Sequence, residues 1–256
     1  MRYLVLALGL VFFALFTFTW ALAALALSMV LPARVARKVG RRGAMWGFRA
    51  YFALMEALGA WRLDLHELDA LRDEGPLIIA PNHPGLLDAP LIVSRLPNAV
   101  CVMKVALLGN FLLGPAARLA RYVRNDSLLR LAASAADELR EGGQLLLFPE
   151  GTRSAGDPIG PFTDAVGAVS RRAGVPVQTL IVEAPRYLGK GRSLFARPPL
   201  PLTYRLRLGR RFDPPSDVRA FTAELERYFT RELARDAARS AAPIAPSVEE
   251  APQVRG

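Results

Sequence analysis

The sequence has 256 residues, enough for one sizeable domain with appended segments, and its apolar share of 52% excludes an intrinsically disordered chain. A single cysteine excludes an internal disulfide framework, and one cysteine with two histidines argues against a bound metal. The net charge of +10 indicates an anionic partner, and residues 1–42 carry six basic residues and no acidic one.

The basic residues near the N-terminus flank a long apolar run. Residues 3–31 contain no charged residue, and a helix needs only about 20 apolar residues to cross a bilayer. Lysine and arginine beside such a run favour anionic lipid headgroups, and not nucleic acid, as the anionic partner. We predict a transmembrane anchor over residues 1–32 in the cell inner (cytoplasmic) membrane. The basic end, residues 34–42, is expected in the cytoplasm with the rest of the chain, and the N-terminus outside.

Two other interpretations of the apolar run stay open. The stretch ALAALA resembles a signal-peptide cleavage site, although the apolar part of a signal peptide is only about 7–15 residues long. A re-entrant or monotopic insertion is the weaker alternative for the topology. Residues 33–60 are predicted to form a basic and amphipathic helical segment near the membrane, with residues 45–65 as a helix on the membrane or on the domain.

Short apolar runs and helical periods alternate through the middle of the chain. This alternation predicts an α/β domain over residues 61–235, with a central mixed sheet flanked by helices. Ser216 is the expected N-cap of the last helix, and the Ala/Pro/Ser/Glu-rich residues 236–256 are expected to be a disordered tail. The predicted elements are strands at 76–80 and 99–103, a helix at 127–143, a strand at 144–148, a helix at 164–174, a strand at 175–182, an edge strand at 202–209 and a helix at 216–236.

The stretch APNHPGLLDAP, residues 80–90, places a histidine and a carboxylate five positions apart. Residues five apart on a helix differ by about 140°, so His83 and Asp88 cannot meet within one helix. Pro84 and Gly85 instead predict a turn after a strand end, and a compact turn can fold Asp88 back onto the imidazole. Strand ends of this kind are where α/β sheets place ligands. The alternative is that Asp88 only caps the following helix, and both roles can coexist.

A second motif, LLLFPEGTRS at residues 145–154, also follows an apolar strand. Glu150 and Arg153 place opposite charges at its end, and Gly151 allows a close approach of backbone to a ligand. The run Gly-Thr-Arg suits an anion site, because a guanidinium can fork onto phosphate oxygens. The alternative is a local ion pair between Glu150 and Arg153 that closes a turn.

The two motifs in this order, about 65 residues apart, resemble the glycerolipid acyltransferase family over residues 60–212. Lys104 and Arg124 are similar to a further, less sharp family motif between them. The resemblance implies that His83 and Asp88 are catalytic. The substrate-binding residues that it implies are Glu150, Gly151, Thr152, Arg153, Lys104 and Arg124.

The resemblance also implies the activity, which is transfer of a fatty acyl group from acyl-CoA or acyl-carrier protein to the hydroxyl of a lysophospholipid. The expected acceptor is 1-acyl-glycerol-3-phosphate, the expected product is phosphatidic acid, and no metal or other cofactor is expected. Val123 and Thr179 replace an acidic residue and a proline that the family usually has, so another lysolipid or a specialised lipid stays open as acceptor. A non-catalytic protein that binds membrane lipids is the second alternative.

Histidine is the side chain that exchanges a proton nearest neutral pH. We therefore expect His83 to take the proton of the attacking hydroxyl while Asp88 orients its ring. Backbone N–H groups near Gly151, or the Arg153 guanidinium, are expected to stabilise the oxyanion or to hold the acceptor phosphate.

Two further residues have chemistry to offer and are expected to stay outside the site. His66 stands in LDLHELDAL without neighbouring glycine or proline, and we expect it at the surface. Cys101 lies inside an apolar strand and is expected in the core.

Overall fold

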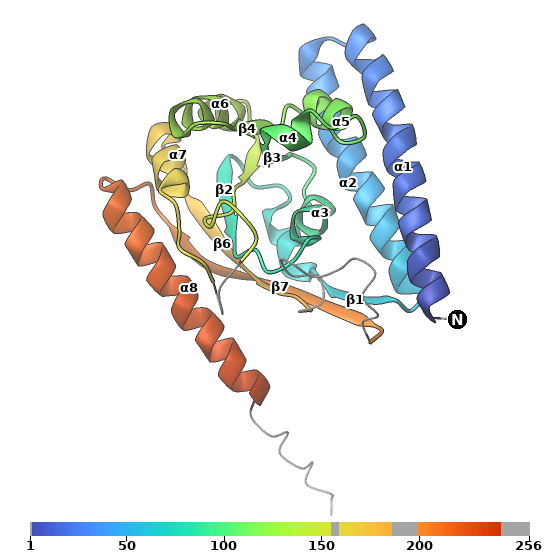
Figure 1. Cartoon of the computed structure of the whole chain (residues 1–256). Helices are drawn as coiled ribbons and strands as arrows, with labels where there is room; N and C mark the ends of the chain where they lie inside the picture. Colours follow the sequence, from blue (N-terminus) through green and yellow to red (C-terminus); the bar gives the residue numbers. More distant parts are fainter. Residues whose placement is uncertain (1, 155–158, 186–198, 242–256) are drawn as a thin grey trace, which may run out of the picture.

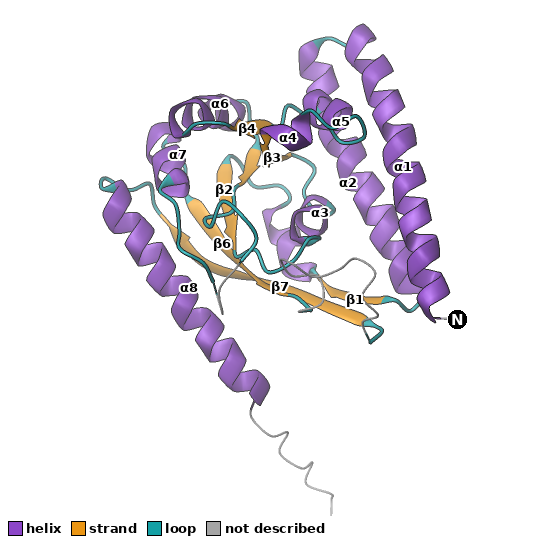
Figure 2. Ribbon diagram, viewed as in Figure 1, coloured by secondary structure: helices purple, strands orange, loops and turns teal. Residues whose placement is uncertain are grey.

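The computed structural model describes residues 2–154, 159–185 and 199–241, and it has an α/β fold (Figure 1). A mixed sheet of seven strands lies between two groups of helices, as Figure 2 shows, which confirms the fold class predicted from the sequence. Strand β7 pairs with β6 antiparallel, and every other pair of neighbours is parallel. The strands, in spatial order, are β1 (Trp61–Asp64), β7 (Leu202–Phe212), β6 (Val177–Glu183), β2 (Leu77–Pro81), β5 (Gln144–Leu146), β3 (Ala99–Lys104) and β4 (Val123–Asn125).

Strand β2 runs through the centre of the sheet and organises both layers of the core. All five of its residues are buried, as expected for a continuous apolar run between two helical layers. Leu77 and Ile79 point into a core shared with α2 and α3, whereas Ile78 and Ala80 point into a core shared with α6, α7 and α8. The carboxyl ends of β2, β5, β3 and β4 lie along one edge of the sheet, because these strands are parallel.

The helices lie on both faces of this sheet, with the α1–α2 pair and α8 on opposite sides of the molecule (Figure 1). Helix α6 follows its N-cap residue, Ser127, whose hydroxyl accepts from the Arg130 N–H. Helix α7 ends at Gly174, which has a positive φ of 67°. The helices are α1 (Arg2–Val30), α2 (Ala33–Ala57), the 3₁₀ helix η1 (His66–Leu71), α3 (Asp88–Val93), α4 (Val105–Leu108), α5 (Gly114–Leu119), α6 (Leu128–Arg140), α7 (Ala165–Ala173) and α8 (Val218–Ala241).

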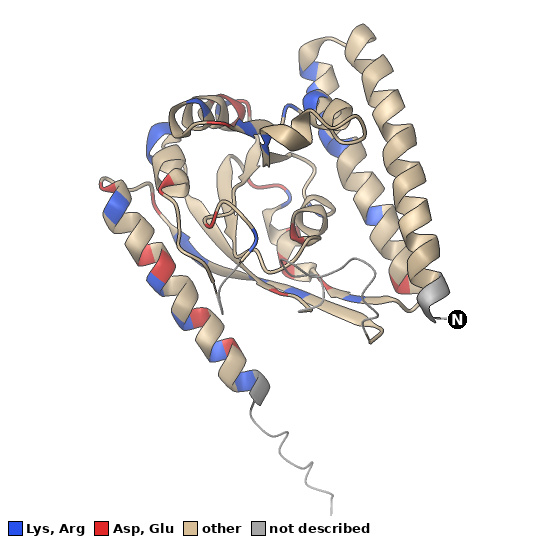
Figure 3. Ribbon diagram, in the orientation of Figure 1, with Lys and Arg blue, Asp and Glu red and all other residues tan. Residues whose placement is uncertain are grey.

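Helices α1 and α2 pack side by side as an antiparallel hairpin. Two glycines of α2 make this possible, because a Cβ on Gly43 would meet the Trp20 ring at 2.2 Å and a Cβ on Gly47 would meet the Phe16 ring at 1.9 Å. The stretch Val5–Val30 is long and apolar enough to cross a membrane. In Figure 3 the ribbon of α1 has no blue or red residue along this length, so no charged residue lies there.

The basic segment at the start of α2 has a role that the sequence did not reveal. Arg37 and Arg41 are buried and form ion pairs with Glu138 of α6, while Arg37 also contacts Glu141 at 2.7 Å. These two arginines therefore fasten α2 to the domain, and the expectation that the whole segment faces lipid headgroups is wrong for them. The remaining basic residues of this segment are exposed, namely Arg34, Lys38 and Arg42.

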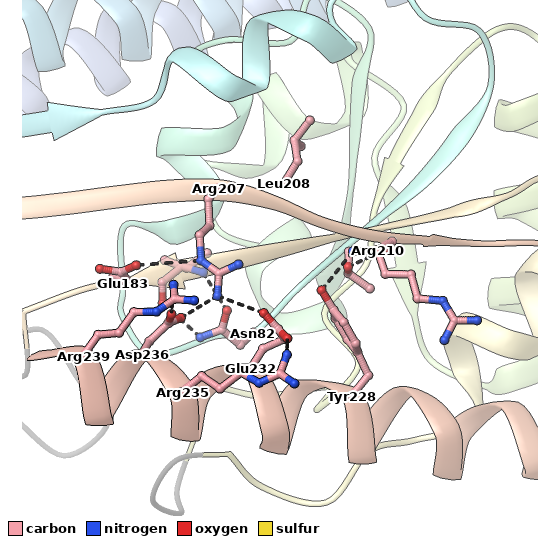
Figure 4. Close-up of polar contacts among 12 residues, drawn as sticks. Asn82, Glu183, Arg207, Leu208, Arg210, Tyr228, Glu232, Arg235, Asp236 and Arg239 are labelled. Carbon is pink, nitrogen blue, oxygen red and sulfur yellow. Dashed lines mark hydrogen bonds and ion pairs between the residues drawn. The ribbon is translucent and has the colours of Figure 1, made fainter.

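Helix α8 is fastened to the sheet by a cluster of charges. Arg207 of β7 contacts Glu232 at 3.3 Å and Asp236 at 2.6 Å, both on α8 (Figure 4). The carboxylate of Asp217, and not the predicted Ser216, accepts the first free N–H groups of this helix. The helix continues to Ala241, so the predicted tail is helical at its start, and its remainder lies outside the described residues.

Two sequence predictions about strands are wrong. The strand predicted at the sheet edge, β7, is paired on both sides, with β6 and with β1. Strand β1 itself falls within residues 45–65, which were predicted as one helix, because α2 ends at Ala57 and the chain turns at Gly59 with φ of 69°. The four residues of β1 then add to β7 at the edge of the sheet.

Candidate active site

The first motif lies in the turn that follows β2. Asn82 joins this turn to β6, because its side chain accepts from the Val182 N–H at 2.7 Å and donates to the Val182 carbonyl at 3.0 Å. These two hydrogen bonds extend the pairing between β2 and β6 by one residue beyond the end of β2. The next residue, His83, is thereby held at a fixed point above the carboxyl edge of the sheet.

His83 and Asp88 meet as the turn interpretation predicted. The distance between His83 Nδ1 and Asp88 Oδ2 is 2.8 Å, and the Gly85 N–H donates to the same oxygen at 2.8 Å. With Nδ1 donating to the carboxylate, the second ring nitrogen, Nε2, carries the lone pair. The His83 side chain is 17% exposed, whereas that of Asp88 is fully buried. The imidazole of His83 is therefore accessible to a ligand, whereas the carboxylate of Asp88 behind it is not.

The alternative role of Asp88 as a helix cap is not what the structure shows. Asp88 is the first residue of α3, the N-cap position belongs to Leu87, and no side chain caps the helix. Burial raises the pKa of Asp88, and this is opposed by the hydrogen bond and charge of His83, by the Gly85 N–H and by the charge of Arg153. These donors and charges offset part of the effect of burial, and the pKa of Asp88 stays above its ordinary value.

The second motif is braced against the first by Glu150. The Glu150 carboxylate is buried; one oxygen accepts from the His83 N–H at 3.2 Å and the Ser154 hydroxyl at 2.7 Å, and the other accepts from the Gly160 N–H at 2.8 Å. The Ser154 N–H in turn donates to the His83 carbonyl at 2.8 Å. Glu150 therefore positions the loops, and both of its oxygens are occupied by this task.

Phe148 supports the imidazole ring of His83 directly. Its ring stacks on the imidazole of His83 with a centroid distance of 3.8 Å and an interplanar angle of 21°. The sequence contains this residue within the FPEGTR motif but gives no sign of the stacking, which depends on β5 lying next to β2. With its Nδ1 bonded and its face covered, the ring of His83 has little freedom to turn.

The rest of the second motif lies at the surface beside the pair. Gly151 and Thr152 are exposed and Arg153 is half-buried. Gly151 has φ of 65°, and its N–H donates to the Phe148 carbonyl at 3.0 Å, so this N–H closes the turn and is not free for an oxyanion. The positive charge of Arg153 is among the groups that oppose the rise in the pKa of Asp88.

Lys104 and Arg124 lie farther along the same edge of the sheet. Lys104 ends β3 and pairs with Asn125, and Met103 pairs with Arg124 on β4. Both basic side chains are exposed, and Arg124 stands 4.0 Å from Asp126. In the order of the strands, β5 and its Phe148–Arg153 loop lie between them and His83.

The two residues kept outside the site are where the sequence placed them. The His66 side chain is 74% exposed and contacts Asp64, so a histidine–aspartate contact by itself does not mark the site. What distinguishes His83 is a buried carboxylate partner. Cys101 is buried in β3, and burial raises the pKa of its thiol to about 12, which makes it a poor nucleophile.

The positions where the sequence departs from the family pattern are core positions. Thr179 is fully buried in β6, and its hydroxyl donates to the Arg210 carbonyl at 2.7 Å, beside an irregularity in the β6–β7 pairing. Val123 is buried in the core under α6. Neither side chain is therefore exposed to contact an acceptor directly.

Comparison with known proteins agrees with this geometry. Residues 62–183 match the family model described as Acyltransferase. Among solved structures, the 1-acyl-sn-glycerophosphate acyltransferase PlsC from Thermotoga maritima superposes with a TM-score of 0.72 at 18% identity, covering 96% of this chain and 100% of that one. No curated protein sequence matches. The matched region contains both motifs, so residues 62–183 are an acyltransferase domain, within a chain that has the fold of PlsC.

Proposed function

We propose that this protein transfers a fatty acyl group from a thioester to the free hydroxyl of 1-acyl-glycerol-3-phosphate, which gives phosphatidic acid. The observation that carries the proposal is the position of the His83 ring, whose Nδ1 is held by a buried carboxylate while the ring stays partly exposed. Arg153 beside this pair supplies a positive charge for the acceptor phosphate. The PlsC fold supports the same acceptor.

The reaction needs one proton acceptor that later becomes a proton donor. His83 Nε2 takes the proton of the hydroxyl as its oxygen attacks the thioester carbonyl, and Asp88 stabilises the imidazolium that forms. As the tetrahedral intermediate collapses, the C–S bond breaks and the imidazolium returns the proton to the leaving sulfur. A C–O bond has replaced a C–S bond, and His83 is again neutral. Neither a covalent enzyme intermediate nor a metal enters this sequence of steps.

The lipid acceptor also requires access to a membrane, and α1 provides it. Its outward face presents large apolar side chains to the surroundings, among them Leu15 at 60% exposure and Met29 at 76%. We infer that this face inserts into the cytoplasmic membrane, with the domain on the cytoplasmic side. The exposed Arg34, Lys38 and Arg42 then meet anionic headgroups.

The activity is tested by incubating the purified full chain in detergent micelles with radiolabelled palmitoyl-CoA or palmitoyl-acyl-carrier protein and a panel of acceptors. The panel contains lysophosphatidic acid, lysophosphatidylglycerol, lysophosphatidylcholine and glycerol 3-phosphate. Label in phosphatidic acid, lost in His83→Ala, is the expected result. Label in another product alone would replace the acceptor, and no transfer to any acceptor would leave a lipid-binding protein.

Arg153 gives a sharper test of the acceptor site. Arg153→Lys keeps the charge but loses the planar fork, so the KM for lysophosphatidic acid should rise about 10-fold, as expected for the loss of one charge-assisted hydrogen bond. The kcat and the melting temperature should change little. An unchanged KM together with a lower melting temperature would show that Arg153 is a structural residue instead. Arg171→Lys, on the far side of α7 at the surface, is the matched control.

A further inference from the structure

Two buried polar atoms behind the catalytic pair have no hydrogen-bond partner among the residues that the structure describes. One is Oδ1 of Asp88, since His83 and Gly85 both donate to Oδ2. The other is the hydroxyl of Tyr204, a fully buried residue of β7. Buried polar atoms are nearly always hydrogen-bonded, so two such atoms in one place call for an explanation.

The backbone of Gly85 shows that these two atoms are neighbours. A Cβ built on Gly85 would stand 2.8 Å from the Tyr204 hydroxyl and 3.0 Å from Asp88 Oδ1. Both oxygens therefore lie within 3.0 Å of one point, and a small rotation or one water molecule joins them. A hydroxyl can donate, and an ionised carboxylate oxygen can only accept. The chemistry of the two atoms is complementary.

The Tyr204 ring is held so that its hydroxyl stays at this point. It stacks on the Trp61 ring of β1 with a centroid distance of 5.6 Å. Burial raises the pKa of Tyr204, and the charge of Asp88 raises it further, so the hydroxyl keeps its proton and remains a donor. The groups with charge or a titrating proton that face the pair are then Tyr204, Arg153 and Glu150.

We propose that Tyr204 is a positioning residue of the acyltransferase site, whose hydroxyl donates to Asp88 Oδ1 and so sets how strongly Asp88 holds the His83 ring. The proposal rests on the proposed role of His83 as the base. A donor on Oδ1 draws negative charge away from Oδ2, which weakens the stabilisation of the imidazolium. Without the hydroxyl, the pair should hold its proton up to a higher pH. Tyr204 lies beyond residues 62–183, so it is not part of the region that matches the family model.

Tyr204→Phe removes only the hydroxyl. We expect the acidic limb of the rate profile to move up by about half a pH unit, with KM unchanged. The matched control is Tyr122→Phe, which removes another buried hydroxyl, next to Cys101 and away from Asp88. A Tyr204→Phe enzyme whose profile coincides with that of the control would overturn the proposal.

A second measurement does not depend on activity. The chain has only two histidines, so an NMR titration of labelled imidazoles resolves His83 once His66→Asn has assigned the other signal. In Tyr204→Phe the His83 signal should change at a higher pH than in the wild type, and in Tyr122→Phe at the same pH. If the wild type transfers no acyl group at all, the proposed function fails, while this titration still decides the role of Tyr204. Equal titration curves in all three proteins would refute it.

Discussion

At the scale of single residues, His83 and Asp88 act as a unit, and their losses should not add. His83→Ala should slow acyl transfer by about 10²–10⁴, the usual contribution of a general base. Asp88→Asn should lose a large part of the same factor, because an amide can hold the wrong tautomer of the ring. The double variant should be little slower than His83→Ala alone. Single-turnover rates measure this, and a double variant slowed by the product of the two factors would show two independent roles.

The burial of Asp88 has an effect on stability that is opposite to its effect on activity. Burial raises the pKa of Asp88 above its ordinary value of 3.8, so the folded state loses stability as the pH rises from 3.8 through the raised value. Asp88→Asn cannot ionise. The difference in free energy of unfolding, Asp88→Asn minus wild type, should therefore increase across this window and stay constant at higher pH. Urea unfolding of both proteins from about pH 4 to about pH 8 measures the difference, and a gain that shrinks with pH would contradict the assignment.

How much of the site the sequence could reveal depends on how far apart its parts are in the chain. His83 and Asp88 are joined by one short turn, so their contact followed from the spacing and from Pro84 and Gly85. Asn82, Phe148 and Tyr204, the supporting residues that the sequence did not reveal, act across β2–β6, β2–β5 and β7–α3 contacts. Such contacts depend on strand order, which local patterns do not encode.

At the scale of elements, the strongest link between the helical hairpin and the domain is Glu138. Its carboxylate forms ion pairs with Arg37, Arg41 and Arg121, and its side chain is only 8% exposed. Glu138→Gln leaves buried arginines without their counter-charge, so the free energy of unfolding should fall by about 3–5 kcal/mol. Glu141→Gln, the same change three residues on at the surface, should have a much smaller effect.

Urea unfolding followed by circular dichroism in detergent compares the two variants. Equal losses would mean that the buried arginines do not depend on Glu138. A second readout is the fluorescence of Trp20, which lies between α1 and α2 at Gly43 and should become more exposed when α2 loosens.

The elements themselves were predictable where one short pattern defines them. Strands β2, β3, β5 and β6 are apolar runs between turn residues, and α6 and α7 have a helical period with a cap or a glycine at the end. The errors occur where two patterns compete. Trp61–Asp64 continues an apolar stretch, so the pattern predicts helix where the structure has a strand. Strand β7 alternates between apolar and polar residues, as an edge strand does, because one of its faces contacts the charged side of α8.

At the scale of the whole molecule, the hairpin constrains how α1 meets a membrane. The N-terminal part of α1 packs against the end of α2, where a Cβ on Gly9 would meet the Met55 side chain at 2.6 Å. Helix α2 leads from there into β1 of the sheet, so the start of α1 lies on the same side as the domain. This packing favours the monotopic topology, which the sequence offered as the weaker alternative to a spanning helix.

Protease protection of epitope tags distinguishes the two topologies. One tag is fused ahead of Met1 and another after Gly256, and spheroplasts are treated with protease from outside. We expect both tags to survive, because the monotopic topology would leave both of them on the cytoplasmic side. Removal of the N-terminal tag alone would instead establish the spanning helix with its N-terminus outside. Deletion of residues 2–31 should give a chain that no longer rises with lipid vesicles in a flotation assay.

The Glu150 brace has a consequence for how such a site can be altered. Because the His83 backbone, Ser154 and Gly160 all bond to one carboxylate, the turn that contains His83 and the loop that contains Arg153 are held together by Glu150. Exchange of one motif for that of a relative would break bonds in the other, and a chimera should work only when both come from the same parent. Substitutions of Lys104 on β3 and Arg124 on β4 should change the acceptor preference more readily. Both exposed residues lie at the same edge of the sheet, and neither is bonded to Glu150.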